Sequence, residues 1–416
     1  MRVHRLVQDV VRARMTDAAR RSRLAAVARA CVEQAAESAR STKSTGSARD
    51  VPDDLAAHLV CLAGHGEALH TEPSGLVDAL ERVAARQAER ALYPAAEHVL
   101  RAALRLHGAG GAVGGPAVQG RLTCALGQVL DTAGRLAPAL ELHREAVELL
   151  EATVDPDDPS RCAVLAHAHN RLGHVLNCAD HAPAAIVAHR RALDVLHRAG
   201  RTDLEPEVLI DLGYTLWGSG ALDAAGEALR SGREMLEEQG RCDERGWAHA
   251  TAGLGMVEQD AGRLDEAVAH QRAAITAFTR VGGAEHPDTA QALDKLGYAL
   301  RLQGRVDEAI DAHRRGVGLL ERVLGPDDSR VAMALTNLGL ALADAGMADR
   351  AVGVQTRARE IFTRTLGDTH SSTLLAGDRL ADALAAAGRP VRAGEVRAEV
   401  DETAERPNDP EPVRSS

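Results

Sequence analysis

Residues 296–320, LGYALRLQGRVDEAIDAHRRGVGLL, form the unit from which most of this 416-residue chain is built. Copies of this stretch begin at Leu126, Leu172, Leu212, Leu254 and Leu338, with a degenerate copy at Leu380. A Gly follows the leading Leu in every copy except the last, which has Ala381. Successive copies are 46, 40 and then 42 residues apart. Self-similarity at a period of this size predicts a solenoid of stacked repeats.

Each copy has the pattern of two short helices. Leu293, Leu296 and Leu300 form an apolar stripe at helical spacing, and Gly297 leaves a notch in it where a second helix can approach closely. A turn follows at Gly304, and the second helix presents Ala309, Ile310, Val317 and Leu320 on one face. Because two short helices cannot bury both faces alone, each pair is expected to stack on the next.

The recurring Leu-Gly, Gly-Arg and Ala positions resemble the tetratricopeptide repeat. The 42-residue step and connectors such as 282–290 (GGAEHPDTA) and 324–332 (LGPDDSRVA) are most similar to the kinesin-light-chain-like variety. This resemblance implies an all-α, right-handed superhelical solenoid of antiparallel helix pairs. It also implies a scaffold that binds a protein segment or peptide.

Composition shifts divide the chain into four predicted parts. Residues 1–49 form a basic helical segment, with eleven Lys and Arg against four Asp and Glu. Residues 50–116 contain degenerate helix pairs and end in a Gly-rich hinge, residues 117–402 form the repeat array, and the Pro-rich residues 403–416 are expected to be disordered.

The segment 3–15, VHRLVQDVVRARM, resembles the region near the end of the winged helix in STAND-type ATPases of the NB-ARC class. In those proteins a nucleotide-binding module precedes a tetratricopeptide sensor. The chain contains no G-x-x-x-x-G-K-[ST] motif, so it is not expected to hydrolyse nucleotide by itself. The resemblance implies the detached sensor half of such a protein, with an ATPase as a candidate partner.

Composition excludes several other classes of protein. The net charge of −11 argues against nucleic acid as a partner. The six cysteines show no disulfide or zinc spacing, so no metal site and no cofactor are predicted. No apolar run is long enough to span a membrane and the N-terminus lacks a signal-peptide core, which favours a cytoplasmic location.

A ligand is expected on the first helix of each pair. Helical phase places offsets −6, −3, +1 and +4 from each Leu-Gly glycine on one face, away from the partner helix. From this face we predict that the binding groove is formed by Asn170, His174, Asn177, Tyr214, Trp217, Met256, Gln259, Asp294, Tyr298 and Arg301. In the first copy the same offsets give Arg121, Cys124, Gln128 and Asp131.

Aromatic residues are only 2% of the chain, and two of its three Tyr and one of its two Trp fall on this face. Aromatic anchors bordered by polar groups are typical of a peptide site. The alternative is that they fill gaps between helices. The two interpretations remain equal for Tyr214 and Tyr298, and packing is favoured for Trp217.

The second helices share another feature, since His143, His189 and His313 occupy equivalent positions. Stacked repeats separate equivalent positions too far for a shared metal ion, so a packing role is expected. No residue pattern indicates a catalytic centre. We therefore predict a non-enzymatic adaptor or regulatory sensor. The alternatives are the detached STAND-type sensor and an enzyme with its pocket inside the superhelix.

Overall fold

The computed structural model describes residues 73–90, 92–109, 115–283 and 285–405. The basic segment 1–49, the segment 3–15 and most of the Gly-rich hinge and of the C-terminal tail therefore lie outside the described residues. Contacts within the chain define two compact units, divided between Thr215 and Leu216.

The first unit is a succession of helix pairs. It contains α4 (Pro73–Glu89), α5 (Tyr93–Ala109), α6 (Gly115–Thr132), α7 (Leu136–Glu151), α8 (Pro159–Cys178), α9 (Ala182–Arg198), the 3-10 helix η2 (Thr202–Leu204) and most of α10 (Glu205–Gly218). Helices α4 and α5 occupy the stretch in which the sequence predicts a degenerate pair.

The second unit continues the same succession. It contains the end of α10, then α11 (Leu222–Glu238), α12 (Arg245–Asp260), α13 (Leu264–Gly282), α14 (Pro287–Leu302), α15 (Val306–Leu324), α16 (Ser329–Asp344), α17 (Ala348–Leu366), α18 (Ser371–Ala386) and α19 (Pro390–Ala404). The described part of the chain contains no strand. The predicted all-α fold of stacked helix pairs is confirmed.

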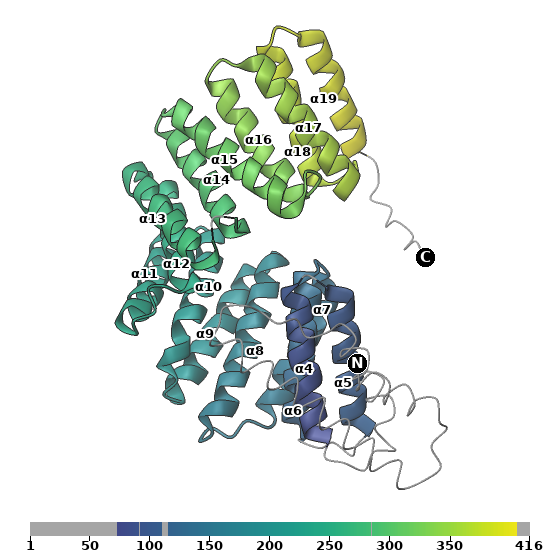
Figure 1. Cartoon of the computed structure of the whole chain (residues 1–416), viewed down its shortest axis with the longest axis vertical. Helices are drawn as coiled ribbons and strands as arrows, with labels where there is room; N and C mark the ends of the chain where they lie inside the picture. Colours follow the sequence, from purple (N-terminus) through teal and green to yellow (C-terminus); the bar gives the residue numbers. More distant parts are fainter. Residues whose placement is uncertain (1–72, 91, 110–114, 284, 406–416) are drawn as a thin grey trace, which may run out of the picture. The chain divides into compact units, whose positions relative to one another are not determined.

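The packing within each unit follows the order of the helices (Figure 1). The second unit illustrates it, because α14 packs on α15, α15 packs on α16, and α14 also contacts α16. First helices therefore lie next to first helices along each unit. A side chain at one offset in a repeat consequently approaches the side chains at neighbouring offsets in the next repeat.

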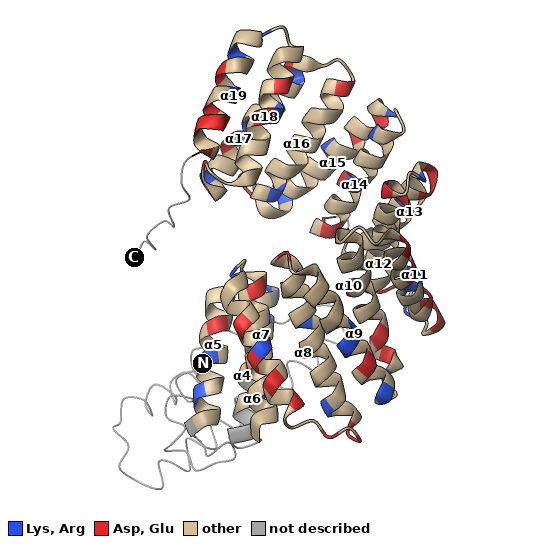
Figure 2. Ribbon diagram, turned by 180° about the vertical axis from the view of Figure 1, so that it is seen from behind, with Lys and Arg blue, Asp and Glu red and all other residues tan. Residues whose placement is uncertain are grey.

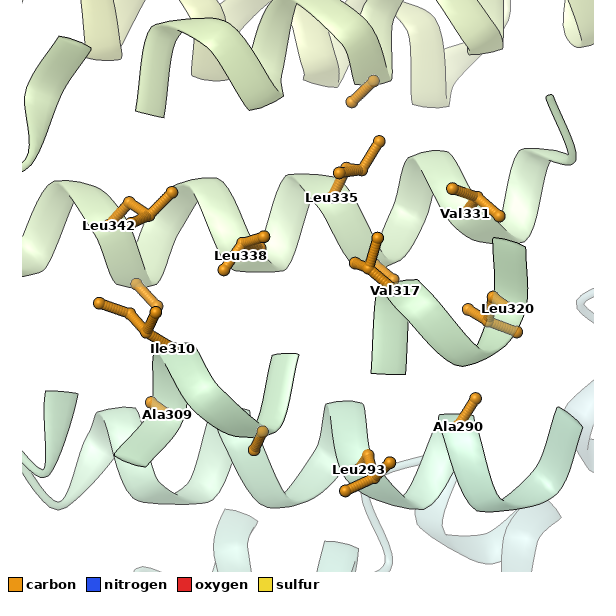
Figure 3. Packing of buried hydrophobic residues seen from close by; sticks show 14 of the residues in the cluster. Ala290, Leu293, Ala309, Ile310, Val317, Leu320, Val331, Leu335, Leu338 and Leu342 are labelled. Atoms are coloured by element: carbon orange, nitrogen blue, oxygen red, sulfur yellow. The ribbon is translucent and has the colours of Figure 1, made fainter. Parts of the chain in front are cut away.

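The core of the second unit is continuous from α13 to α18. Leu293 on α14, Ile310 and Val317 on α15, and Leu335 and Leu338 on α16 belong to one buried cluster, and Figure 3 shows them along three successive helices. Each fully buried Leu or Ile side chain contributes about 1.5–3 kcal/mol. Stability therefore depends on interfaces between neighbouring pairs.

The turns between paired helices are set by backbone conformation. Gly304 has φ 76°, and the next residue donates its backbone N–H to the carbonyl of Leu300, the pattern of a Schellman cap. Glycines at the equivalent turn of other repeats, such as Gly262 and Gly346, also have positive φ. In the second copy this position is Asp180, with φ 60°, the single non-Gly residue with positive φ in the described ranges.

Charged side chains do not separate by sign on either unit. Figure 2 shows Lys and Arg interspersed with Asp and Glu along the helices. Many of them pair across successive repeats, as do Arg301 with Asp344 and Arg389 with Asp349. Such exposed pairs contribute little to stability one by one, but they help to set how neighbouring helices align.

Candidate functional site: the first-helix stripe

In five of the six Leu-Gly pairs the glycine contacts one side chain of the second helix, sixteen residues later. A Cβ at Gly297 would lie 2.7 Å from three ring atoms of His313, and one at Gly173 would lie 2.6 Å from the ring of His189. The same contact joins Gly127 to His143, Gly255 to Gln271 and Gly339 to Gln355. The predicted notch and the packing role of the three histidines are therefore confirmed.

In two repeats the residue three positions before the glycine is polar, and its side chain lies within hydrogen-bond distance of the histidine ring that packs on the glycine. Asn170 Oδ1 lies 2.7 Å from Nδ1 of His189, and Asn170 Nδ2 donates a hydrogen bond to Asp211 Oδ2 at 2.7 Å. Asp211 lies on α10, the first helix of the next repeat. A three-residue chain, His189–Asn170–Asp211, thus connects two helix pairs inside the first unit.

The second unit contains an equivalent series of three hydrogen-bonded side chains, in which the amide and the carboxylate residue are exchanged. Asp294 Oδ1 lies 2.7 Å from Nδ1 of His313, and Asn337 Nδ2 donates to Asp294 Oδ2 at 2.7 Å. The carboxylate and the amide have swapped places relative to the first unit. Where Gln replaces the histidine it needs no such partner, because Gln271 Nε2 donates to the backbone carbonyl of Ala252.

Burial keeps two of these histidines neutral. His189 is fully buried, and loss of solvation lowers its pKa to about 4. Loss of solvation likewise lowers the pKa of His143 to about 3. Neutral imidazoles on glycine notches are structural elements of the repeat.

The predicted groove residues therefore occupy two different environments. Asn170 is only 7% exposed, and its side chain is used by His189 and Asp211; Asp294 is bound by His313 and Asn337. Met256 is also 7% exposed. Asp294 remains partly exposed, and so do the other seven, namely His174, Asn177, Tyr214, Trp217, Gln259, Tyr298 and Arg301.

These seven partly exposed residues all lie at offsets +1 and +4, and we call them the first-helix stripe. His174, Asn177 and Tyr214 belong to the first unit. Trp217, Gln259, Tyr298 and Arg301 belong to the second.

In the second unit, aspartate side chains accept hydrogen bonds from residues of the first-helix stripe. Trp217 Nε1 donates a hydrogen bond to Asp260 Oδ2 at 2.7 Å, and Gln259 Nε2 donates to Asp260 Oδ1 at 3.3 Å. Arg301 lies over the ring of Tyr298, 5.3 Å from its centroid, and donates to Asp344 Oδ2 at 2.8 Å. The side chains of the stripe are therefore oriented rather than free to rotate.

Asp260 and Asp344 are members of this arrangement that the predicted set does not contain. Both lie at offset +5, and each accepts a hydrogen bond from offset +4 of the preceding repeat, 43 residues earlier. Aligning the copies shows an Asp at +5 in both, which is a detectable signal. Which residue it pairs with depends on how consecutive first helices lie against each other.

In the first unit, His174 of the first-helix stripe lies near an aspartate and a cysteine. His174 Nε2 lies 3.7 Å from Asp131 Oδ2 and 3.8 Å from Cys178 Sγ. Arg171 Nη2 donates to the same Asp131 oxygen at 2.6 Å. Asp131 and His174 stand at offsets +4 and +1 of consecutive repeats, so both are among the positions that helical phase assigns to the face.

None of the described helices is both long and apolar enough to cross a membrane.

Residues 124–160, 247–322 and 331–372 match the tetratricopeptide repeat family. No curated protein matches the chain. Among solved structures, the TPR-like repeats of a kinesin light chain from Podosopora anserina are 22% identical, covering 47% of this chain and 92% of that one with a TM-score of 0.42. Two further solved structures cover more of the chain.

A Rap protein complexed with Competence and Sporulation Factor is 12% identical, covers 80% of this chain and 100% of that one, and has a TM-score of 0.52. Another similar structure is a signal transduction ATPase with numerous domains from Pyrococcus horikoshii, which has a tetratricopeptide repeat sensor. It is 10% identical, covers 85% of this chain and 53% of that one, and has a TM-score of 0.54. At these identities the likeness concerns the fold. The family matches show that residues 124–160, 247–322 and 331–372 are tetratricopeptide repeats, and the stacked helix pairs of the described residues have the same fold.

Proposed function

We propose that the chain is a non-enzymatic scaffold that binds a protein segment or peptide and acts as an adaptor or regulatory sensor. The observation that carries this proposal is the state of the aromatic residues on the first-helix stripe. Tyr214, Trp217 and Tyr298 remain partly exposed in a chain that has few aromatic residues. Side chains used only to fill gaps between helices would be buried like Phe278 and Phe362.

The chemistry of the stripe in the second unit suits recognition of a peptide. Tyr, Trp and Arg are the residues that most often dominate binding energy at protein interfaces. Asp260 orients Trp217, Asp344 orients Arg301, and Arg301 lies over the ring of Tyr298 before any partner arrives. Orientation in advance reduces the conformational entropy lost on binding.

The proposed partner is therefore a polypeptide with apolar side chains for Trp217 and Tyr298, together with polar groups for the flanking amide and charged residues. The solved Rap protein, similar in fold over 80% of this chain, was crystallised in complex with Competence and Sporulation Factor. This supports a binding role for the fold. The four described cysteines are free thiols, which agrees with a cytoplasmic location for the scaffold.

A second candidate is the sensor half of a STAND-type switch. The observation that favours it is the likeness in fold to the Pyrococcus horikoshii ATPase, which covers 85% of this chain but 53% of that protein. An ATPase would then be the partner that receives the signal. Recovery of an ATPase bound stoichiometrically to this chain would favour this candidate over a free-standing adaptor.

The experiment compares four variants of the full chain in pull-downs from the native cell. Trp217→Ala and Tyr298→Ala test the stripe of the second unit, and Tyr214→Ala tests the first. Val323→Ala is the control, because Val323 is an exposed apolar residue on the second helix α15. We expect the stripe variants to lose about tenfold or more of a specific partner, and the control to retain it.

Circular dichroism should remain helical in all four variants, since none of the substituted residues is buried. Once the partner is identified, its dissociation constant for each variant gives the quantitative measure. Equal retention by Trp217→Ala, Tyr298→Ala, Tyr214→Ala and the control would overturn the proposed binding face.

A further inference from the structure

In the first unit three metal-ligating side chains converge where α8 packs against α6. Asp131 lies near the end of α6, and His174 and Cys178 lie one turn apart on α8. One ligand atom from each of them, a carboxylate oxygen, an imidazole nitrogen and a thiol sulfur, lies within 4.8 Å of the other two. This cluster is built by tertiary structure, because more than forty residues separate Asp131 from the other two.

The separations are close to those of a tetrahedral zinc centre. With bonds of about 2.0 Å to nitrogen and oxygen and about 2.3 Å to sulfur, tetrahedral angles place N and O about 3.3 Å apart, and N and S about 3.5 Å apart. The His174 nitrogen is 3.7 Å from the Asp131 oxygen and 3.8 Å from the Cys178 sulfur. The Asp131 and Cys178 ligand atoms lie within 4.8 Å of each other, so binding of the ion requires side-chain rotations that shorten these separations.

The donor set selects the class of metal ion. A thiolate, an imidazole and a carboxylate together suit Zn²⁺, whereas Mg²⁺ and Ca²⁺ prefer oxygen ligands alone. The thiolate and the carboxylate would neutralise the two charges of the ion. Cys178 is exposed and His174 is partly exposed, so an ion in solution can reach the cluster.

Arg171 adds a positive charge at this place. It donates to Asp131 Oδ2 at 2.6 Å, and Asp131 is only 8% exposed. Carboxylates that ligate a metal commonly accept such an outer hydrogen bond, which fixes their orientation. Arg171 therefore positions the carboxylate toward His174, while its positive charge offsets part of the attraction for a cation.

We propose that Asp131, His174 and Cys178 form a binding site for Zn²⁺, with a fourth coordination position open to water or to a donor from a bound molecule. Three protein ligands with one open position are the pattern of reactive rather than purely structural zinc sites. The proposal goes beyond the scaffold function and does not depend on it. It also departs from the sequence analysis, which predicts no metal site because no ligand spacing indicates one along the chain.

Cobalt(II) titration of the full chain, after removal of metal with a chelator, provides the test. Co²⁺ bound to a thiolate gives a strong near-ultraviolet charge-transfer band that histidine and carboxylate ligands alone do not give. We expect one equivalent of Co²⁺ to produce this band and Zn²⁺ to displace it. Cys178→Ser should abolish the band, and His174→Gln should weaken binding about tenfold or more.

Cys242→Ser is the matched control, since Cys242 is a partly exposed free thiol in the second unit. Its band should equal that of the unsubstituted chain. Circular dichroism checks the fold of Cys178→Ser, which alters an exposed side chain. The proposal is overturned if saturating Co²⁺ gives no thiolate band, or if the band persists unchanged in Cys178→Ser.

Discussion

The imidazole ring of His313 occupies the space that a side chain on Gly297 would need. A Cβ at Gly297 would lie 2.7 Å from Cδ2, Cε1 and Nε2 of that ring, well inside van der Waals contact. The Leu-Gly pair and the residue sixteen positions later are therefore one packing unit. This relationship requires a spacing of sixteen residues between the glycine and its partner within the helix pair.

Gly297→Ala should destabilise the second unit by about 1–3 kcal/mol, because the added methyl group overpacks the helix pair. The additional substitution His313→Ala removes the clashing ring and should make Gly297→Ala nearly neutral in that background. Denaturant unfolding of the two single variants and the double variant measures this coupling. Additive effects would contradict the contact.

The exchange of amide and carboxylate between the two hydrogen-bonded series, His189–Asn170–Asp211 and His313–Asp294–Asn337, predicts a compensating pair of substitutions. Asn337→Asp places a second carboxylate beside Asp294 and should destabilise the second unit by roughly 2 kcal/mol at pH 7. Asp294→Asn in the same chain should restore most of this loss, since it recreates the order His–Asn–Asp found at His189. A double variant no more stable than Asn337→Asp alone would refute this equivalence.

The buried histidines predict acid sensitivity of the first unit. Burial lowers the pKa of His189 to about 4 in the folded state, whereas unfolded chains have a histidine pKa near 6.5. Between these values the unfolded state binds a proton that the folded state does not. Stability is therefore full above about pH 6.5 and falls as the pH decreases toward about 4, by roughly 2 kcal/mol between pH 7 and pH 5.

His189→Gln provides the control for this pH dependence. Gln271 and Gln355 occupy the equivalent position and pack on their own glycines, so glutamine fits the site. The variant should lose less stability between pH 7 and pH 5 than the unsubstituted chain, as measured by urea unfolding at both values. Identical pH profiles would show that His189 titrates normally.

Asp180 predicts a stabilising substitution. It has φ 60° at a turn where other repeats have glycine, and non-glycine residues in this region are strained. Asp180→Gly should raise the free energy of unfolding by roughly 1 kcal/mol, while the matched change Gly304→Ala should lower it by about the same amount. Thermal unfolding of both variants decides this, and a destabilised Asp180→Gly would show that the aspartate side chain has a role of its own.

The repeat pattern was sufficient to predict the helix pairs, their turns and the notch at each glycine. These features depend on local spacing, such as the periodic Leu293, Leu296 and Leu300, which the chain displays directly. The packing role of His313 could also be predicted, because the same position recurs in several copies. The binding face remains a prediction, and its side chains prove to have two kinds of environment.

The offset −3 positions illustrate the limit of helical phase. Phase assigns Asn170 and Asp294 to the same face as Tyr298, but their side chains turn toward a histidine of the second helix and a residue of the next repeat. The direction of these side chains depends on their rotamers and on the angle at which the helices cross. Neither can be predicted from the spacing of residues along the sequence. Asp260 and Asp344 recur at one offset in the sequence, but their pairing with Trp217 and Arg301 depends on helix crossing in the same way.

The sequence by itself determined a periodic all-α chain of helix pairs, because period, glycine notches and turn residues act over a few neighbouring positions. Only the tertiary structure decided which side chains of successive first helices meet. Asp131 reaches His174 and Cys178, and Trp217 reaches Asp260, through the stacking of whole helix pairs. Such contacts join residues about forty positions apart, and they depend on the packing geometry that stacking creates.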